Sequence, residues 1–160
     1  PAYPDADIDT MLDWLLDQNR AGRKAGAGFY TYDGAGKRIG LWDGLREGYP
    51  IAATQPDLTQ VQHRLLLVQV LEAVRAFESG VLTDIREGDV AAILGWGFAP
   101  WSGGPFSWID RIGAARVVSI CEGLSKSAGS RFDAPNLLCD LAESGQGFYD
   151  RFGTQDQTAA

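Results

Sequence analysis

LTQVQHRLLLVQVLEAVRAFES, which runs from Leu58 to Ser79, is the stretch that decides the fold. Wound as a helix, it carries apolar side chains around most of its circumference, and its polar positions form a narrow stripe through Gln62, Gln69 and Glu72. Gly80 follows, as is typical of a helix C-terminus. The pattern predicts a long central helix that is packed on several sides.

Helical spacing of apolar residues recurs on both sides of this segment. Upstream, the positions that share it are Ile8, Met11, Leu12 and Leu15, and the basic, glycine-rich NRAGRKAGAG then ends the helix. Downstream, a helix begins near Asp84, whose carboxylate can cap it while Glu87 reaches back. Further helices are indicated at 117–124 and, after Pro135, at 137–141. The sequence therefore predicts an all-α helical bundle with long loops rich in glycine and aromatic residues.

The segment between residues 26 and 56 has no sustained period. Its many glycines indicate a linker. Its aromatic residues, Phe29, Tyr30, Tyr32 and Trp42, are too apolar for a solvated flexible linker, so we expect the segment to pack against another part of the protein. Asp33-Gly34 could form a small hairpin turn.

Two similar motifs lie near the two ends of the chain. GAGFY at residues 26–30 resembles GQGFY at residues 145–149, about 120 residues further on, and each follows a short Leu-rich helix. We expect two copies of one domain type: the tail of a first copy at 1–33, a linker at 34–56, a second copy at 57–153 and a disordered tail at 154–160. The alternative is a chance similarity of two glycine caps.

Composition excludes several classes of function. A chain of 160 residues with a net charge of −7 and an isoelectric point near 4.6 repels phosphate backbones, which argues against nucleic acid as a partner. Apolar runs such as 65–68 are far shorter than the roughly 20 residues that span a bilayer. The acidic start, PAYPDADID, does not resemble a signal peptide, and a first residue that is Pro rather than Met hints at a fragment or a processed chain. Cys121 and Cys139 have no CxxC partner or nearby histidine, so we expect reduced, buried thiols and no metal site.

Common catalytic templates do not fit. Neither pair of closely spaced glycines, at 26–28 or 95–97, completes a dinucleotide-binding fingerprint, and Gly36-Lys37 lacks the rest of a P-loop. His63 is the only histidine, and we interpret it as a solvated or packing residue rather than a general base. Glu87 and Asp89 look like solvated helix charges.

A longer pattern carries a family resemblance. Gly97-Phe98-Ala99-Pro100, then Gly103-Gly104-Pro105, then Trp108-Ile109-Asp110, lie in that order within RLLLVQVLEAVRAFESGVLTDIREGDVAAILGWGFAPWSGGPFSWIDRIGAARVV. This run resembles the C-terminal domain of the 3-hydroxyacyl-CoA dehydrogenase family. More closely, it is similar to the second copy of that domain in the multifunctional α-subunits of fatty-acid β-oxidation, which also carry an enoyl-CoA hydratase. GRKAGAGFYTYD and GQGFYDRF resemble the ends of the first and second copies.

The resemblance implies a fold like the C-terminal domain of 6-phosphogluconate dehydrogenase, and a role in the NAD-dependent oxidation of L-3-hydroxyacyl-CoA. In the family, the catalytic histidine and glutamate, the NAD-binding domain and the hydratase domain all precede the part that this chain matches. We therefore expect no catalytic residue and no cofactor in the chain, with NAD bound only by the intact enzyme. The NAD-binding and hydratase domains of the same polypeptide would be its partners, and the second copy would replace the dimer partner found in single-domain relatives.

Residues 95–110 admit two interpretations. The glycines and prolines can make a sharp connection between helices, which the rings of Phe98, Trp101, Phe106 and Trp108 then fill. Alternatively, the loop lies over the acyl-CoA cleft of the neighbouring domain. The candidates for a position near substrate or at an interface are Trp96, Phe98, Pro100, Trp101, Gly103 and Gly104.

Two classes of function remain. The first is a C-terminal part of a β-oxidation α-subunit that is inactive when isolated. The second is a non-catalytic helical interaction module that binds a partner such as a thiolase subunit. For either class we expect a bacterial cytoplasmic location and some self-association of the isolated chain.

Overall fold

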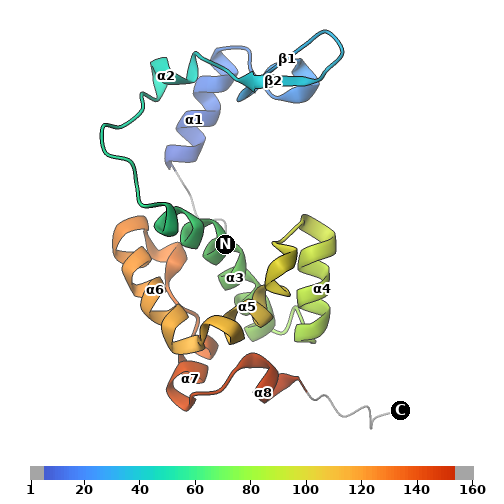
Figure 1. The fold of residues 1–160 in the computed structure, drawn as a ribbon, viewed down its shortest axis with the longest axis vertical. Helices are drawn as coiled ribbons and strands as arrows, with labels where there is room; N and C mark the ends of the chain where they lie inside the picture. The colour runs from blue at the N-terminus through green and yellow to red at the C-terminus, as the bar shows by residue number, and fades with distance from the viewer. Residues whose placement is uncertain (1–5, 154–160) are drawn as a thin grey trace. The chain divides into compact units, whose positions relative to one another are not determined.

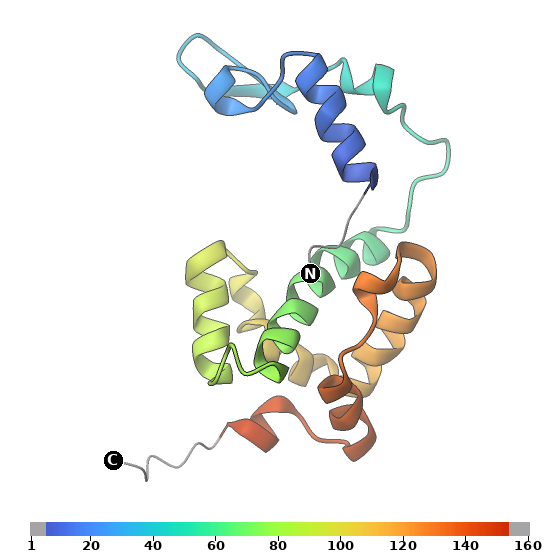
Figure 2. The ribbon, with the colours of Figure 1, turned by 180° about the vertical axis from the view of Figure 1, so that it is seen from behind.

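The computed structural model describes residues 6–153, with side chains from Ile8 onward, and divides the chain into two compact units, 1–55 and 56–160. Figure 1 and Figure 2 show the course of the chain through both units. The expected disordered tail at 154–160 lies outside the described residues. No helix among the described residues is long and apolar enough to cross a membrane.

The first unit is a helix followed by a β-hairpin. Its elements are α1 (Ala6–Asp17), the 3-10 turn η1 (Arg23–Ala25), β1 (Tyr30–Tyr32), β2 (Arg38–Leu41) and α2 (Leu45–Gly48). The strands are antiparallel, with Tyr30 opposite Leu41. Asp33 closes the connection, because its Oδ1 accepts hydrogen bonds from the backbone N–H groups of Ala35 and Lys37, both at 2.9 Å. A hairpin thus forms at the predicted turn, in a chain that is otherwise mostly helical.

Of the expected linker at 34–56, residues 34–55 belong to this folded unit. They contain β2 and α2, and the Trp42 ring lies against the ring of Trp14 in α1, with centroids 5.5 Å apart. Tyr49 meets Trp14 edge-on at 5.4 Å. These aromatic contacts account for the apolar composition of the segment, and the break between the units falls after Gln55.

The second unit is a helical bundle. It comprises α3 (Leu58–Glu78), α4 (Ile85–Trp96), η2 (Pro100–Ser102), α5 (Pro105–Ile112), α6 (Ala114–Ala128), η3 (Ser130–Phe132), α7 (Asn136–Ser144) and α8 (Phe148–Phe152). Figures 1 and 2 show α4 and α6 on opposite sides of α3, with α7 and α8 at one end. The helices predicted from the periodicity correspond to α1, α3, α4, α6 and α7. Asp84 caps α4 as expected, since its side chain accepts a hydrogen bond from the Arg86 N–H at 2.8 Å.

Helix α5 is the main difference from the prediction. The sequence predicts a connection over 95–110, whereas the structure has a two-turn helix there that packs against α3, α4, α6 and α8. Pro105 begins α5 at its first position, where a missing N–H costs nothing. The helix is short and flanked by glycines, so its period is hard to see in the sequence.

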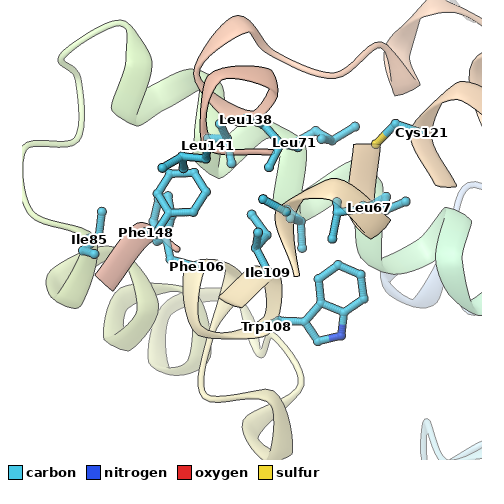
Figure 3. Packing of buried hydrophobic residues seen from close by; sticks show 14 of the residues in the cluster. Leu67, Leu71, Ile85, Phe106, Trp108, Ile109, Cys121, Leu138, Leu141 and Phe148 are labelled. Carbon is cyan, nitrogen blue, oxygen red and sulfur yellow. The ribbon is translucent and has the colours of Figure 1, made fainter. Parts of the chain in front are cut away.

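The core of the second unit is one continuous apolar cluster. Helix α3 contributes Leu67, Val70, Leu71 and Val74, and α5 contributes Phe106, Trp108 and Ile109. Figure 3 labels Leu67, Leu71, Phe106, Trp108 and Ile109 among them, together with Leu138, Leu141 and Phe148. Helix α3 contacts α5, α6, α7 and η3, as expected of a central helix, but Leu58, Leu65 and Val68 in its first half are exposed.

Candidate functional site

The predicted loop begins where α4 ends. Gly97 has a φ of 77°, in the left-handed region that favours glycine, and its N–H closes the helix on the carbonyl of Ala92. The chain then turns inward, because the N–H of Phe98 donates to the same carbonyl at 3.0 Å and the Phe98 ring is fully buried. Phe98 is therefore a core residue of the second unit.

The next turn brings the chain into α5. Pro100 begins the short η2 turn, and Gly103, with a φ of 84°, ends it. Gly104, with a φ of 114°, lies so close to the carboxylate of Asp89 that a Cβ at this position would collide with it. Gly103 and Gly104 are thus required by backbone conformation and by the approach of a buried acid, which agrees with a structural role.

Asp89 is the buried polar centre of this region and is only 3% exposed. Its Oδ1 accepts a hydrogen bond from the N–H of Phe106 at 2.8 Å, and its Oδ2 accepts from the N–H and the hydroxyl of Ser107 at 3.0 and 2.6 Å. The hydroxyl of Tyr149 donates to Oδ2 at 2.9 Å. Burial, reinforced by this bond to an acidic oxygen, raises the pKa of Tyr149. The interpretation of Asp89 as a solvated helix charge is therefore wrong, because four donors compensate its burial.

The same arrangement recurs at two other helix starts. Asp110 accepts from the N–H groups of Phe148 and Tyr149, at 2.6 and 2.8 Å, and so caps α8. Glu78 accepts from the N–H of Leu137 at 2.8 Å and caps α7. The N-cap positions of α5, α7 and α8 are Gly104, Pro135 and Gly147, whose side chains make no capping hydrogen bond. Acids from other helices take over the capping and tie the bundle together.

Two of the six candidates have exposed rings. Trp96 is 57% exposed, and its indole N–H donates to the Gln69 side-chain oxygen at 3.1 Å. Trp101 is 65% exposed, and the guanidinium of Arg111 lies 5.2 Å from its ring centroid. Nη1 of Arg111 also donates to the Trp101 carbonyl at 3.2 Å. The structure thus divides the aromatic residues of the loop into buried packing residues, such as Phe98, and surface rings.

His63 lies at the edge of a surface hollow rather than in a catalytic arrangement. The hollow has a volume of about 490 Å³ and is lined by Gln62, His63, Leu65, Leu66, Trp101, Trp108, Arg111 and Ile112. No carboxylate is among these residues, so nothing in the hollow could orient His63 as a base.

Both cysteines are free thiols. Cys121 is buried and Cys139 is partly buried, which confirms the expectation for Cys121 and modifies it for Cys139. Burial raises the pKa of Cys121 to about 11 and also raises that of Cys139. Within the part of the chain that the structure describes, no group of three or more His, Cys, Asp or Glu residues could hold a metal ion.

Two residues that organise this region were missed from the sequence. Asp89 resembled a surface acid because its neighbour Glu87 is one, and Arg111 was not considered. One signal was available for Asp89. The start of α5, Gly104-Pro105, offers no side-chain cap of its own, so an acid from elsewhere in the chain was to be expected.

Comparison with known proteins identifies the relatives of the chain. It is 38% identical over 144 residues to the "Fatty acid oxidation complex subunit alpha" of Shewanella halifaxensis, a match that covers 88% of this chain and 20% of that protein. Subunits of the same name from Shewanella baltica and Shewanella amazonensis are 37% and 38% identical, over 86% of the chain. No family model matches.

Among solved structures, the crystal structure of FadB2 from M. tuberculosis is similar over 54% of this chain and 32% of that one, with 25% identity and a TM-score of 0.48. The assignment rests on the sequence relatives, of whose length the chain spans about one fifth. Over that part, the chain belongs to the family of fatty acid oxidation complex α-subunits.

Proposed function

We propose that the chain is the C-terminal helical part of the 3-hydroxyacyl-CoA dehydrogenase in such an α-subunit, with a fold like the C-terminal domain of 6-phosphogluconate dehydrogenase. It supports the NAD-binding domain, which oxidises L-3-hydroxyacyl-CoA, and its second unit replaces the missing dimer partner. NAD-dependent chemistry, the hydratase activity and the cytoplasmic location belong to the intact protein. The observation that carries the proposal is the match of most of the chain to about one fifth of each relative.

The residues themselves support a role without catalysis. His63 has no acid in its hollow, and the buried acid Asp89 is engaged by four donors that hold the bundle together. Gly26 and Gly28 lie before a hairpin strand rather than at the phosphate-binding start of a helix. These features favour a scaffold for a site in another domain.

The test is a dehydrogenase assay in which acetoacetyl-CoA is the substrate and loss of NADH is followed by absorbance. We expect no turnover and no calorimetric heat with the isolated chain, and we expect turnover when the chain is joined to the remainder of an α-subunit. Deleting the chain from that fusion should abolish turnover. Turnover by the isolated chain would overturn the proposal, as would full activity of a fusion partner that lacks it.

A second candidate is an interaction module that binds a partner protein such as a thiolase subunit. The exposure of the Trp96 and Trp101 rings favours it, because large exposed rings often lie at protein interfaces. Sedimentation of the chain alone and with a thiolase subunit would detect both self-association and complex formation. A sedimentation coefficient that stays that of the free monomer in both experiments would argue against this candidate.

A further inference from the structure

The hollow beside α3 and α5 has the chemistry of a small ligand site, and neither the family nor the proposed function requires it to bind anything. Its volume of about 490 Å³ lies within the range of roughly 300–1,000 Å³ that is usual for small-molecule pockets. Leu65 and Leu66 of α3 and Ile112 of α5 supply apolar walls. The hollow could therefore hold an apolar group of moderate size.

The largely buried side chain of Trp108 is part of its wall. Trp108 is only 3% exposed, and its indole N–H makes no hydrogen bond to any described residue. No side-chain nitrogen or oxygen among the described residues is both fully buried and unpaired, so this N–H keeps some access to solvent. Figure 3 shows the blue ring nitrogen at the edge of the cluster, on the side away from Phe106 and Phe148. Buried indoles usually find an acceptor, and a ligand in the hollow can supply one in place of solvent.

A cation lies in the same wall. Arg111 uses Nη1 for the carbonyl of Trp101, and its Nε and Nη2 groups donate to no atom of the described residues. The neighbouring Trp101 ring holds the guanidinium in place, with 5.2 Å between them. Gln62 and His63 add polar groups at the rim. A guanidinium with unused donors matches the geometry of a carboxylate.

The charge of the residues that line the hollow also favours an anionic ligand. The chain has a net charge of −7, yet no Asp or Glu lines this hollow. Another hollow of similar size, beside α6 and α7, is lined by Glu122 and Asp133 as well as Lys126, and would repel an anion. In the first unit, the hollow beside α1 contains Arg20, but its guanidinium is bound to the carbonyls of Gly28 and Tyr30.

From these observations we propose that the hollow between α3 and α5 binds a carboxylate that carries an apolar chain. The carboxylate accepts hydrogen bonds from Arg111 and from the indole N–H of Trp108, and the chain lies against Leu65, Leu66 and Ile112. Binding is non-covalent and does not depend on the dehydrogenase function proposed above.

The test is an NMR titration of the ¹⁵N-labelled 160-residue chain with octanoate. Substitution Trp108→Phe identifies the Trp108 indole cross-peak among those of the five tryptophans. We expect this peak to move downfield and to saturate, while the Trp14 and Trp42 peaks stay in place. Acetate lacks the apolar chain and 1-octanol lacks the charge, so each should bind at least about tenfold more weakly than octanoate.

Matched variants separate the site from general adsorption. Arg111→Gln should weaken octanoate binding about tenfold or more, since a hydrogen bond to a charged group is lost. Trp108→Phe removes the donor together with part of the buried indole ring, so a loss of about threefold or more is expected, and the thermal unfolding of this variant has to be compared with that of the parent chain. Arg116→Gln, which removes an exposed charge on α6 outside the hollow, should leave affinity unchanged.

Three results would overturn the proposal: no saturable shift of the Trp108 peak at millimolar octanoate, equal affinity for octanoate and 1-octanol, or equal losses in the Arg111 and Arg116 variants. Thermal unfolding of each variant shows whether a loss of binding reflects a loss of the fold. If Arg111→Gln unfolds, Arg111→Lys replaces it, and this variant should keep part of the affinity. None of these measurements follows NADH, so the outcome is independent of the dehydrogenase assay.

Discussion

The GAGFY motif at 26–30 and the GQGFY motif at 145–149 are nearly identical in sequence and fold differently. In the first, Tyr30 starts a β-strand and Phe29 is exposed. In the second, Phe148 starts helix α8 and is fully buried in the core. The local sequence therefore does not decide between strand and helix at this motif.

The difference lies in the partners of the backbone. In the first motif a cation binds carbonyls, because Arg20 donates to the oxygens of Gly28 and Tyr30 at 2.7 and 3.0 Å. In the second motif an anion binds amides, because Asp110 accepts from the N–H groups of Phe148 and Tyr149. Free N–H groups are the feature of a helix start, so a carboxylate favours the helix there.

The largest expected difference in stability is between substitutions of the two phenylalanines. Phe148→Ala should lower the free energy of unfolding of the second unit by about 3–5 kcal/mol, because it leaves a cavity beside Phe77 and Phe106. Phe29→Ala should cost about 1 kcal/mol or less in the first unit, since Phe29 is exposed. Urea unfolding followed by circular dichroism measures both, and similar costs would show that the two motifs are equivalent after all.

Asp89 supports the second motif through Tyr149, whereas no Asp or Glu among the described residues of the first unit is buried. Asp89→Asn should cost about 2–4 kcal/mol, because an amide cannot accept from all four donors. Glu87→Gln on the same helix is the control, and a change within about 0.5 kcal/mol is expected for this exposed side chain. Equal effects of the two substitutions in urea unfolding would show that Asp89 behaves as a solvated surface charge.

Removing the charge of Asp110 tests the anion that binds the second motif. Asp110→Asn should cost about 1–3 kcal/mol in thermal unfolding, because a charged acceptor of two amides is lost. Hydrogen exchange of the Phe148 and Tyr149 amides should accelerate. Asp140→Asn, on the exposed face of α7, is the matched control, and unchanged exchange in the Asp110 variant would contradict the capping role.

The corresponding test of the first motif is a substitution of Arg20. Arg20→Gln loses two hydrogen bonds to carbonyls and the contact of the guanidinium with Trp42, 4.2 Å from its ring centroid. We expect a cost of about 1–2 kcal/mol confined to the first unit. The measurement is the shift of Trp42 fluorescence in urea, with Lys24→Gln, an exposed charge nearby, as control. A loss of stability in the second unit instead would contradict the division into two units.

The smallest effect separates the two tyrosines. Tyr149→Phe loses the hydrogen bond to Asp89 and should cost about 1 kcal/mol. The hydroxyl of Tyr30 makes no hydrogen bond to the described residues, so Tyr30→Phe should cost nothing measurable.

Because the pKa of Tyr149 is raised above its ordinary 10.0, the unfolded chain ionises first. The stability from Tyr149 is thus complete below pH 10 and is lost as pH rises through the folded pKa. Chemical unfolding between pH 9 and 11 should show a steeper loss in the parent than in the Tyr149 variant.

Some of the structure followed from the sequence alone. The 3.6-residue spacing predicted five helices, the Asp84–Glu87 pair predicted the cap of α4, and Asp33-Gly34 predicted the hairpin turn, because in each case the signal lies within a few neighbouring residues. The ordered pattern from Gly97 to Asp110 also indicated the family, since long motifs are rarely matched by chance.

The tertiary structure decided what local signals could not. The N-cap residues of α5 and α8 are glycines without a capping side chain, and Asp89 and Asp110 reach the first N–H groups of these helices from other helices. The division of rings into a buried Phe98 and an exposed Trp101, like the unpaired N–H of Trp108 beside Arg111, depends on which faces of α3 and α5 meet. Helix periodicity and motifs are properties of neighbouring residues, whereas capping acids, burial and hollows arise only when distant segments are brought together, and so they could be read only from the folded chain.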